Sequence, residues 1–140
     1  TPSINYGYGY DAVGNRTSRL AGSSADTYAY SPTSNRIASI TPQSGPVRSF
    51  VFDANGSTTA DGLNTYAYDV RGRMVQAVSA LGTTSYQVNA LGQRIRKSNA
   101  QDDRVFHYDA QGRLIAETDP GGALRREIFY LGDIPVGVFQ

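Results

Sequence analysis

The chain restates one short phrase six times, at intervals of sixteen to twenty-two residues. Most copies have two aromatic residues two positions apart, then Asp, Asn or Ser, two variable residues and Gly. The copies begin at Tyr8, Tyr28, Phe50, Tyr66, Tyr86 and Phe106, and a seventh opening at Ile128 starts the phrase and then leaves it. Repetition with this period indicates a stacked array of equivalent units. The repeat therefore constrains the fold more than any single residue does.

The polar residue and the glycine of each copy predict a tight turn. A type I turn favours Asp, Asn or Ser first and Gly last, and with a left-handed glycine it joins the strands of a hairpin. The first position is Asp11, Ser31, Asp53, Asp69, Asn89 and Asp109, and the last is Gly14, Gly56, Gly72, Gly92 and Gly112. Ser34 departs from the glycine rule. In that copy Pro32 presets φ for the same turn, and Asn35 can take the left-handed conformation.

The stretches between these turns are predicted to be strands. Residues two positions apart project from one face of a strand, so each aromatic pair shares a face. The aromatic residue directly before the turn is Tyr10, Tyr30, Phe52, Tyr68 and Tyr108. The residues within the pairs suit a less buried face; they are Gly9, Ala29, Val51, Ala67, Gln87 and His107. Return turns are expected within residues 22–24, 43–46, 61–62, 81–82, 98–101 and 119–122.

Each repeat is therefore predicted to be one β-hairpin, and about thirteen strands should follow one another. The expected fold class is all-β, an antiparallel meander of repeated hairpins that forms a curved, shell-like sheet. Residues 1–140 are expected to be one segment of six to seven repeats, open at both ends. A meander this wide should curl or split into two packed sheets. Residues 73–81 would also pass as a short helix by spacing, but the repeat phase favours a strand.

Neighbouring repeats are expected to stack their aromatic pairs into rows, with arginine stems covering the rings. The terminal strands lack a capping element and should expose unpaired edges, so the isolated chain is expected to self-associate. Because the sequence opens with Thr1 rather than Met, it is interpreted as a piece of a longer protein. That interpretation leaves targeting signals undecided.

Composition excludes several classes of function. The net charge of +1 gives no reason to expect nucleic-acid binding, and no apolar run is long enough for a membrane helix. The absence of cysteine removes disulfides and thiolate metal sites. Ten tyrosines and fifteen glycines without tryptophan are typical of strands and tight turns. No cofactor or metal site is expected, and no membrane insertion.

The residues that could carry chemistry have simpler structural interpretations. His107 is the one histidine, and it occupies the same slot as Ala67 and Gln87. The repeated aspartates could form a carboxylate row, but Asn89 and Ser31 replace them, which a catalytic or calcium-binding role would not tolerate. The basic cluster 94–97 lies across a turn from 102–103, where two aspartates favour cross-strand charge pairing. The chain is therefore expected not to be an enzyme.

The phrase Tyr-Asp-x-x-Gly-Arg, complete at Tyr68–Arg73 and Tyr108–Arg113, resembles the YD repeat of Rhs proteins. Tyr10–Arg16 is similar to the Asn-Arg ending of that repeat, and Tyr130–Val136 resembles the segment after the last regular repeats of the Rhs core. The resemblance implies a β-sheet that coils into a hollow shell, as in the C subunits of insecticidal toxin complexes and the teneurins. In the bacterial members, the shell encloses a toxic C-terminal domain.

The same resemblance implies that the partners are the rest of the parent shell and its enclosed toxin, and that the protein is bacterial and either secreted or on the cell surface. Residues 119–122 superficially resemble the family's Asp-Pro-x-Gly self-cleavage motif, but they lie where the repeat requires a turn.

Two hypotheses of function follow. In the first, the chain is a structural segment of a shell that encapsulates a C-terminal toxin or effector domain. In the alternative, the tyrosine rows form a recognition module that binds glycans or partner proteins at a cell surface, since flat aromatic faces bury area at low entropy cost.

Overall fold

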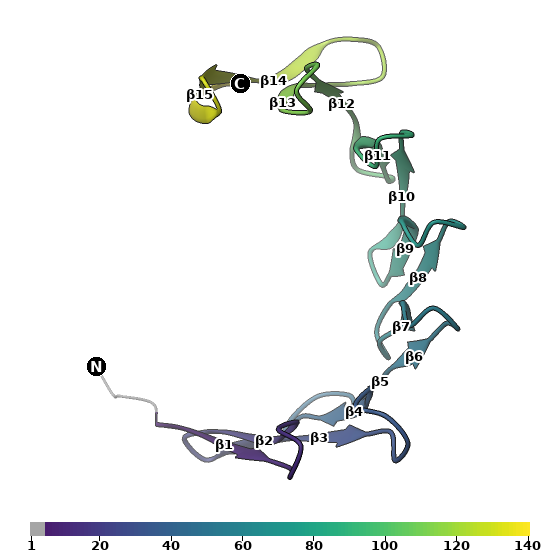
Figure 1. Ribbon diagram of the computed structural model, residues 1–140, viewed down its shortest axis with the longest axis vertical. Helices are drawn as coiled ribbons and strands as arrows, with labels where there is room; N and C mark the ends of the chain where they lie inside the picture. The colour runs from purple at the N-terminus through teal and green to yellow at the C-terminus, as the bar shows by residue number, and fades with distance from the viewer. Residues whose placement is uncertain (1–4) are drawn as a thin grey trace. The chain divides into compact units, whose positions relative to one another are not determined.

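Every regular element of the protein is a β-strand, as the computed structural model of residues 5–140 shows (Figure 1). None of the described elements is a helix that could span a membrane. The chain divides into two compact units, residues 1–65 and 66–140, and each is described separately below. Residues 1–4 of the predicted segment 1–140 lie outside the described residues.

The first unit opens with a five-stranded antiparallel sheet in chain order. Its strands are β1 (Tyr6–Tyr10), β2 (Arg16–Ala21), β3 (Ser24–Tyr30), β4 (Ile37–Thr41) and β5 (Arg48–Ser49). The short strands β6 (Val51–Phe52) and β7 (Thr58–Ala60) follow as a hairpin that begins a second, ten-stranded sheet, and β7 pairs with β8 (Thr65–Tyr68), which begins at the unit boundary.

The second unit continues the same pattern from β8 onward. Its strands are β9 (Met74–Ser79), β10 (Gly82–Val88), β11 (Arg94–Ser98), β12 (Asp103–Tyr108), β13 (Leu114–Thr118), β14 (Leu124–Leu131) and β15 (Ile134–Phe139). Hydrogen bonding runs in sequence order from β6 to β15, without a crossover. The predicted antiparallel meander of hairpins is therefore confirmed. Residues 74–79 form a strand, so the helical alternative for 73–81 is wrong.

The described residues contain fifteen strands rather than the expected thirteen. One extra strand arises because the predicted strand through Phe50 is broken. The amide of Phe50 donates to Ala38 O at 2.9 Å, which ends the pairing with β4, and β6 then pairs with β7 instead. The other arises at the seventh opening, where Gly132 adopts a φ of 59° and returns the chain as β15. The irregular seventh copy is therefore a hairpin too.

Neither unit has an ordinary hydrophobic core. Among the described residues only Phe106, Glu117 and Asp61 are buried, with exposed fractions of 8%, 5% and 6%. The strands instead have one half-buried face and one exposed face, which the alternation along β3, β10 and β14 shows. An alternating pattern of this kind is typical of a single-layered antiparallel sheet. Packing within the layer, from strand to strand, must therefore supply the stability.

The aromatic residues of the phrase lie on the half-buried face in β3, β8 and β12. The residues within the pairs are exposed, as predicted, at Ala29, Val51, Ala67, Gln87 and His107. β1 is the exception, because Tyr8 and Tyr10 are 50% and 61% exposed and Gly9 is half-buried. β1 is an outer strand of its sheet, so within residues 5–140 its rings have a neighbouring strand on one side only.

Candidate functional site

The first residue of each regular turn organises the backbone around it. In the copy at Asp69, carboxylate Oδ1 accepts hydrogen bonds from the amides of Arg71 at 2.9 Å and Arg73 at 3.0 Å. The amide of Asp69 in turn donates to Arg73 O at 2.9 Å. The same bonds recur at Asp11, Asp53, Asn89 and Asp109. One acceptor atom therefore satisfies two turn amides in each of these copies.

The fourth residue of these turns is in the left-handed region. The φ angles are 89° at Gly14, 89° at Gly56, 74° at Gly72, 85° at Gly92 and 84° at Gly112. The return turn at Asp119 has the same geometry, since Gly122 has a φ of 90° and Ala123 N donates to Asp119 Oδ1 at 2.9 Å. The Asp-Pro-Gly-Gly segment therefore serves as a turn of the repeat type.

The turn at Ser31 differs from the prediction. Its amide donates to Arg36 O, five residues on, whereas the regular turns close after four. Asn35 does not adopt the left-handed conformation, because among the described residues only glycines have positive φ. The extra residue removes the need for a left-handed position, so a turn without glycine closes. As a consequence, the carbonyl of Arg36 closes the turn at Ser31, as the carbonyl of Arg73 closes the turn at Asp69.

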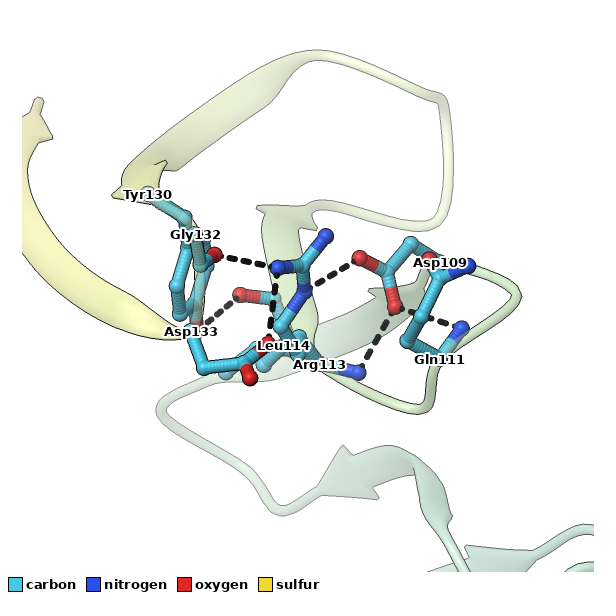
Figure 2. Close-up of polar contacts among 7 residues, drawn as sticks. All are labelled: Asp109, Gln111, Arg113, Leu114, Tyr130, Gly132 and Asp133. Carbon is cyan, nitrogen blue, oxygen red and sulfur yellow. Dashed lines mark hydrogen bonds and ion pairs between the residues drawn. The ribbon is translucent and has the colours of Figure 1, made fainter.

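The arginine that ends the turn ties one repeat to the next. Arg113 donates from Nε to Asp109 Oδ2 at 2.7 Å, and from a terminal nitrogen to Gly132 O in the following turn (Figure 2). The same nitrogen lies 3.3 Å from Asp133 Oδ1. Its guanidinium also lies 5.1 Å from the centre of the Tyr130 ring.

Arg73 makes the equivalent bonds two repeats earlier, to Asp69 Oδ2 at 2.7 Å and to Asn89 O at 2.8 Å. A planar guanidinium suits this task because its fork of donors can address a carboxylate and a carbonyl together. We call the group of turn carboxylate, arginine and next-turn carbonyl the repeat clamp.

A tyrosine hydroxyl makes a second tie in the opposite direction. Tyr130 OH donates to Leu114 O at 3.0 Å (Figure 2), Tyr108 OH to Arg94 O at 3.0 Å and Tyr30 OH to Arg16 O at 3.0 Å. In each case the acceptor opens the strand after the turn of the preceding repeat. These three tyrosines, each directly before a turn, thus reach back to the neighbouring repeat. Phe52 and Val88 stand at this position in two copies and have no hydroxyl to donate.

Where the turn ends in an amide side chain, arginine follows one residue later and stacks between rings. The guanidinium of Arg94 lies 5.8 Å from the ring centre of Tyr86 in its own repeat and 4.7 Å from that of Phe106 in the next. Arg16 lies 5.9 Å from Tyr8 and 4.5 Å from Tyr28 in the same way. These contacts bridge adjacent repeats by cation–π attraction.

The clamp changes the acidity of its carboxylates. The hydrogen bond from the Arg73 side chain, helped by the Arg73 amide, lowers the pKa of Asp69 to about 2. The Arg113 amide, and then its side chain, lower the pKa of Asp109 although partial desolvation opposes them. Hydrogen bonds to the charged form favour it. Both carboxylates are therefore ionised at neutral pH and suit structural acceptance of hydrogen bonds.

The remaining predicted residues lie along the same face or at its edge. Tyr10 is exposed on β1, Phe52 lies under Arg36 at 5.6 Å, and Tyr68 is half-buried on β8. The predicted cross-strand charge pairing is confirmed for Arg96 and Asp103, whose closest atoms are 2.6 Å apart. His107 is exposed, and its Nε2 lies 3.0 Å from Thr118 Oγ1.

Sequence reasoning missed the ties between repeats. It assigned the aspartate and glycine to the turn, but it gave the tyrosine hydroxyl and the final arginine no specific partner. The signal was present in the fixed Tyr-Asp-x-x-Gly-Arg spacing, which places both donors at one end of the hairpin. Within residues 5–140, no group of three or more His, Cys, Asp or Glu side chains could hold a metal ion.

Comparison with known proteins agrees with this architecture. The family model described as Teneurin YD-shell matches residues 2–134. A search of curated proteins finds no match. Among solved structures, the crystal structure of TcdB2-TccC3-TEV aligns with a TM-score of 0.62 and 16% identity, over 89% of this chain and 7% of that one.

The Photorhabdus luminescens Tc holotoxin pore with a TccC3 mutation aligns equally well, with a TM-score of 0.62 and 16% identity over 88% of this chain. The chain spans about 7% of the length of these two structures, and at this identity the likeness establishes the fold. The family match covers nearly all of the sequence and confirms the YD-repeat resemblance. The chain belongs to the Teneurin YD-shell family.

Proposed function

We propose that this chain is a wall segment of a YD-repeat shell that encapsulates a C-terminal toxin or effector domain in the full-length protein. The observation that carries the proposal is the clamp made by Arg73 and Arg113, each of which bonds its own turn and the next one. A single-layered sheet needs such in-plane ties because it has no second layer to pack against. A shell wall made of one such sheet needs the same in-plane ties between repeats.

The lack of a buried core supports a structural role over a catalytic one. Chemistry requires a nucleophile, base or metal held in a water-excluded site. The charged groups of the described sheets instead pair with one another along the layer, as Glu117 does with Arg104 at 2.8 Å and with Arg126 at 3.6 Å. We infer that any enzymatic activity of the parent resides in its enclosed domain.

We further propose that residues 1–140 act as one continuous segment, paired at both edges by other repeats of the parent. β1 and β15 are outer strands of their sheets, and β15 carries only apolar residues and glycine. Exposed strand edges of this kind associate. The isolated chain should therefore elute as oligomers in size-exclusion chromatography with light scattering, and a monodisperse monomer would refute the edge argument.

The encapsulation itself is tested by proteolysis of the full-length parent protein. We expect its C-terminal domain to resist a protease that digests the same domain expressed alone. Replacing Arg73 and Arg113 together with Ala should open the wall and restore digestion. Equal digestion rates for the enclosed and free domain would refute encapsulation, and imaging of the parent by electron microscopy should show a hollow coil.

The alternative, recognition of glycans or partner proteins by exposed tyrosines, finds its support at β1. Tyr6, Tyr8 and Tyr10 are all at least half exposed there, whereas the tyrosines of later repeats are half-buried. A glycan array probed with the chain and with its Tyr8→Ala variant separates the two functions. Binding that the substitution abolishes would favour recognition. We also propose a bacterial, secreted or cell-surface location for the parent, which secretion assays of the parent protein would test.

A further inference from the structure

An open cleft of about 580 Å³ lies where the regular pairing of the first unit is interrupted. Its walls are the turn that begins at Ser31, the start of β4 and the strand β6. After Phe50 donates to Ala38 O, β6 leaves β4, so Ile37 and Ala38 face Val51 across a gap instead of a ladder. The cleft is thus the space that would be closed if β6 paired with β4 beyond Phe50.

The cleft contains an arginine that lacks its usual carboxylate. Arg36 ends its turn as Arg73 and Arg113 end theirs, but the first residue of the turn is Ser31 rather than Asp. Arg73 has Asp69 Oδ2 at 2.7 Å, whereas no carboxylate within the described residues pairs with Arg36. Its guanidinium instead rests 5.6 Å from the Phe52 ring centre and against Gly56. The cation is therefore held in place and left open on one side.

The turn amides are also less well satisfied here. Ser31 Oγ accepts from Thr33 N at 3.4 Å, and Ser34 Oγ accepts from Arg36 N at 3.4 Å. In the regular copies the corresponding distances from the aspartate or asparagine Oδ1 lie between 2.8 and 3.0 Å. The hydroxyls of Ser31 and Thr33 lie 3.3 Å apart at the same place. A further acceptor between these donors would improve their hydrogen bonding.

We propose that this cleft binds a carboxylate group carried by a ligand, which takes the place of the aspartate missing from the turn. Arg36 would donate to one carboxylate oxygen from two of its nitrogens, as Arg73 does to Asp69 Oδ2. The hydroxyls of Thr33 and Ser34 would bind the rest of a polar ligand, and Phe50 and Phe52 would pack against its apolar part. The proposal stands on the residues of the cleft alone and does not depend on the shell.

The probe is N-acetyl-aspartate N-methylamide, whose one carboxylate is that of the missing side chain, titrated into the isotope-labelled chain and followed by NMR. We expect shifts confined to the amides of Thr33, Ser34 and Arg36, with the weak affinity of one exposed ion pair. N-acetyl-asparagine N-methylamide has the same shape without any carboxylate and should not bind. Equal binding of both amides, or binding of inorganic phosphate without binding of N-acetyl-aspartate N-methylamide, would overturn the carboxylate assignment.

Three substitutions locate the binding. Arg36→Gln removes the charge-assisted bonds and should weaken binding at least about tenfold. Arg71→Gln removes an exposed turn arginine elsewhere and should leave binding unchanged. Ser31→Asp supplies an internal carboxylate that occupies Arg36, so it should weaken binding by a similar factor while the chain stays folded. If Arg36→Gln unfolds the chain, the Ser31→Asp variant tests the site instead. Unchanged binding by Ser31→Asp would refute the site.

Discussion

The regular stack of the second unit and the interrupted region within the first use the same repeat to different effect. From β9 to β15 every strand pairs with the next, and arginine clamps and tyrosine hydroxyls connect successive turns. In residues 31–64 the turn at Ser31 is one residue longer than the regular turns. The pairing with β4 stops at Phe50, and Phe52 stands where other repeats have the tyrosine directly before the turn. One irregular turn thus accompanies the loss of the strand pairing after Phe50 and of the hydroxyl tie.

The interrupted region is stabilised by a different contact. Arg48 on β5 donates to Asp61 Oδ2 at 2.5 Å, and Asp61 also accepts from the amides of Leu63 and Asn64. Gly62 packs directly on β5, since a Cβ placed on it would lie 2.6 Å from Ser49 N. The Arg48–Asp61 ion pair and the close backbone approach at Gly62 therefore join β5 to the turn after β7, where the pairing of β4 with β6 is missing. The comparison teaches that a YD sheet can be held by either device.

The largest expected effect comes from Gly62→Ala. Gly62 has a φ of 83° and Gly72 a φ of 74°, so alanine at either costs about 1–2 kcal/mol from the left-handed conformation. At position 62 the clash with β5 adds roughly 1–3 kcal/mol, whereas no atom lies within 4 Å of the Cβ at position 72. Thermal unfolding of Gly62→Ala and Gly72→Ala measures the difference. Equal melting temperatures would show that the close approach at β5 contributes nothing.

An intermediate effect is expected from Arg113→Lys. Lysine keeps the charge but cannot bond Asp109, Gly132 and the Tyr130 ring with one planar group. The melting temperature should fall by more than for Arg36→Lys, because Arg36 has no carboxylate partner within the described residues. Differential scanning fluorimetry of both variants tests the ranking. A larger loss at position 36 would reverse our assignment of the stabilising clamps to the regular stack.

The sequence predicts the regular stack well and the interruption poorly, for a physical reason. The turn at Asp69 is encoded locally, since one carboxylate and one glycine decide its geometry within five residues. The break at Phe50 depends on how β4 and β6 meet, which is a contact between residues more than ten positions apart. Ser34 in place of glycine indicates an irregular turn, but this replacement does not reveal that the turn is one residue longer. Likewise, the aromatic phrase predicts rows of rings, but only coordinates show which carbonyl each hydroxyl reaches.

A smaller effect is expected from removing one tyrosine hydroxyl. Tyr130→Phe loses the bond to Leu114 O and should cost about 0.5–1.5 kcal/mol. Tyr86→Phe is the matched control, because the Tyr86 ring lies on the same face under Arg94 and no hydrogen bond of its hydroxyl is found in the described structure. Chemical denaturation followed by circular dichroism gives both values. A Tyr86→Phe loss as large as that of Tyr130→Phe would mean that the rings, rather than the hydroxyl ties, carry the energy.

The smallest expected effect is a difference in the pH dependence of stability between a turn that begins with aspartate, at Asp69, and the turn that begins with Ser31. The pKa of Asp69 falls from an ordinary value near 3.8 to about 2 in the folded chain, so folding favours its ionised form. Its stabilising contribution is fully present above pH 4 and is lost as the pH falls from about 4 to about 2. The melting temperature of Asp69→Asn should therefore fall less steeply than that of the parent chain between about pH 4 and about pH 2, the acid limb of the curve. Ser31→Asn should leave that limb unchanged, because Ser31 does not titrate. If the Asp69→Asn chain keeps the parent's acid limb, the carboxylate is not coupled to folding, and the clamp at this turn rests on the arginine-to-carbonyl bond alone.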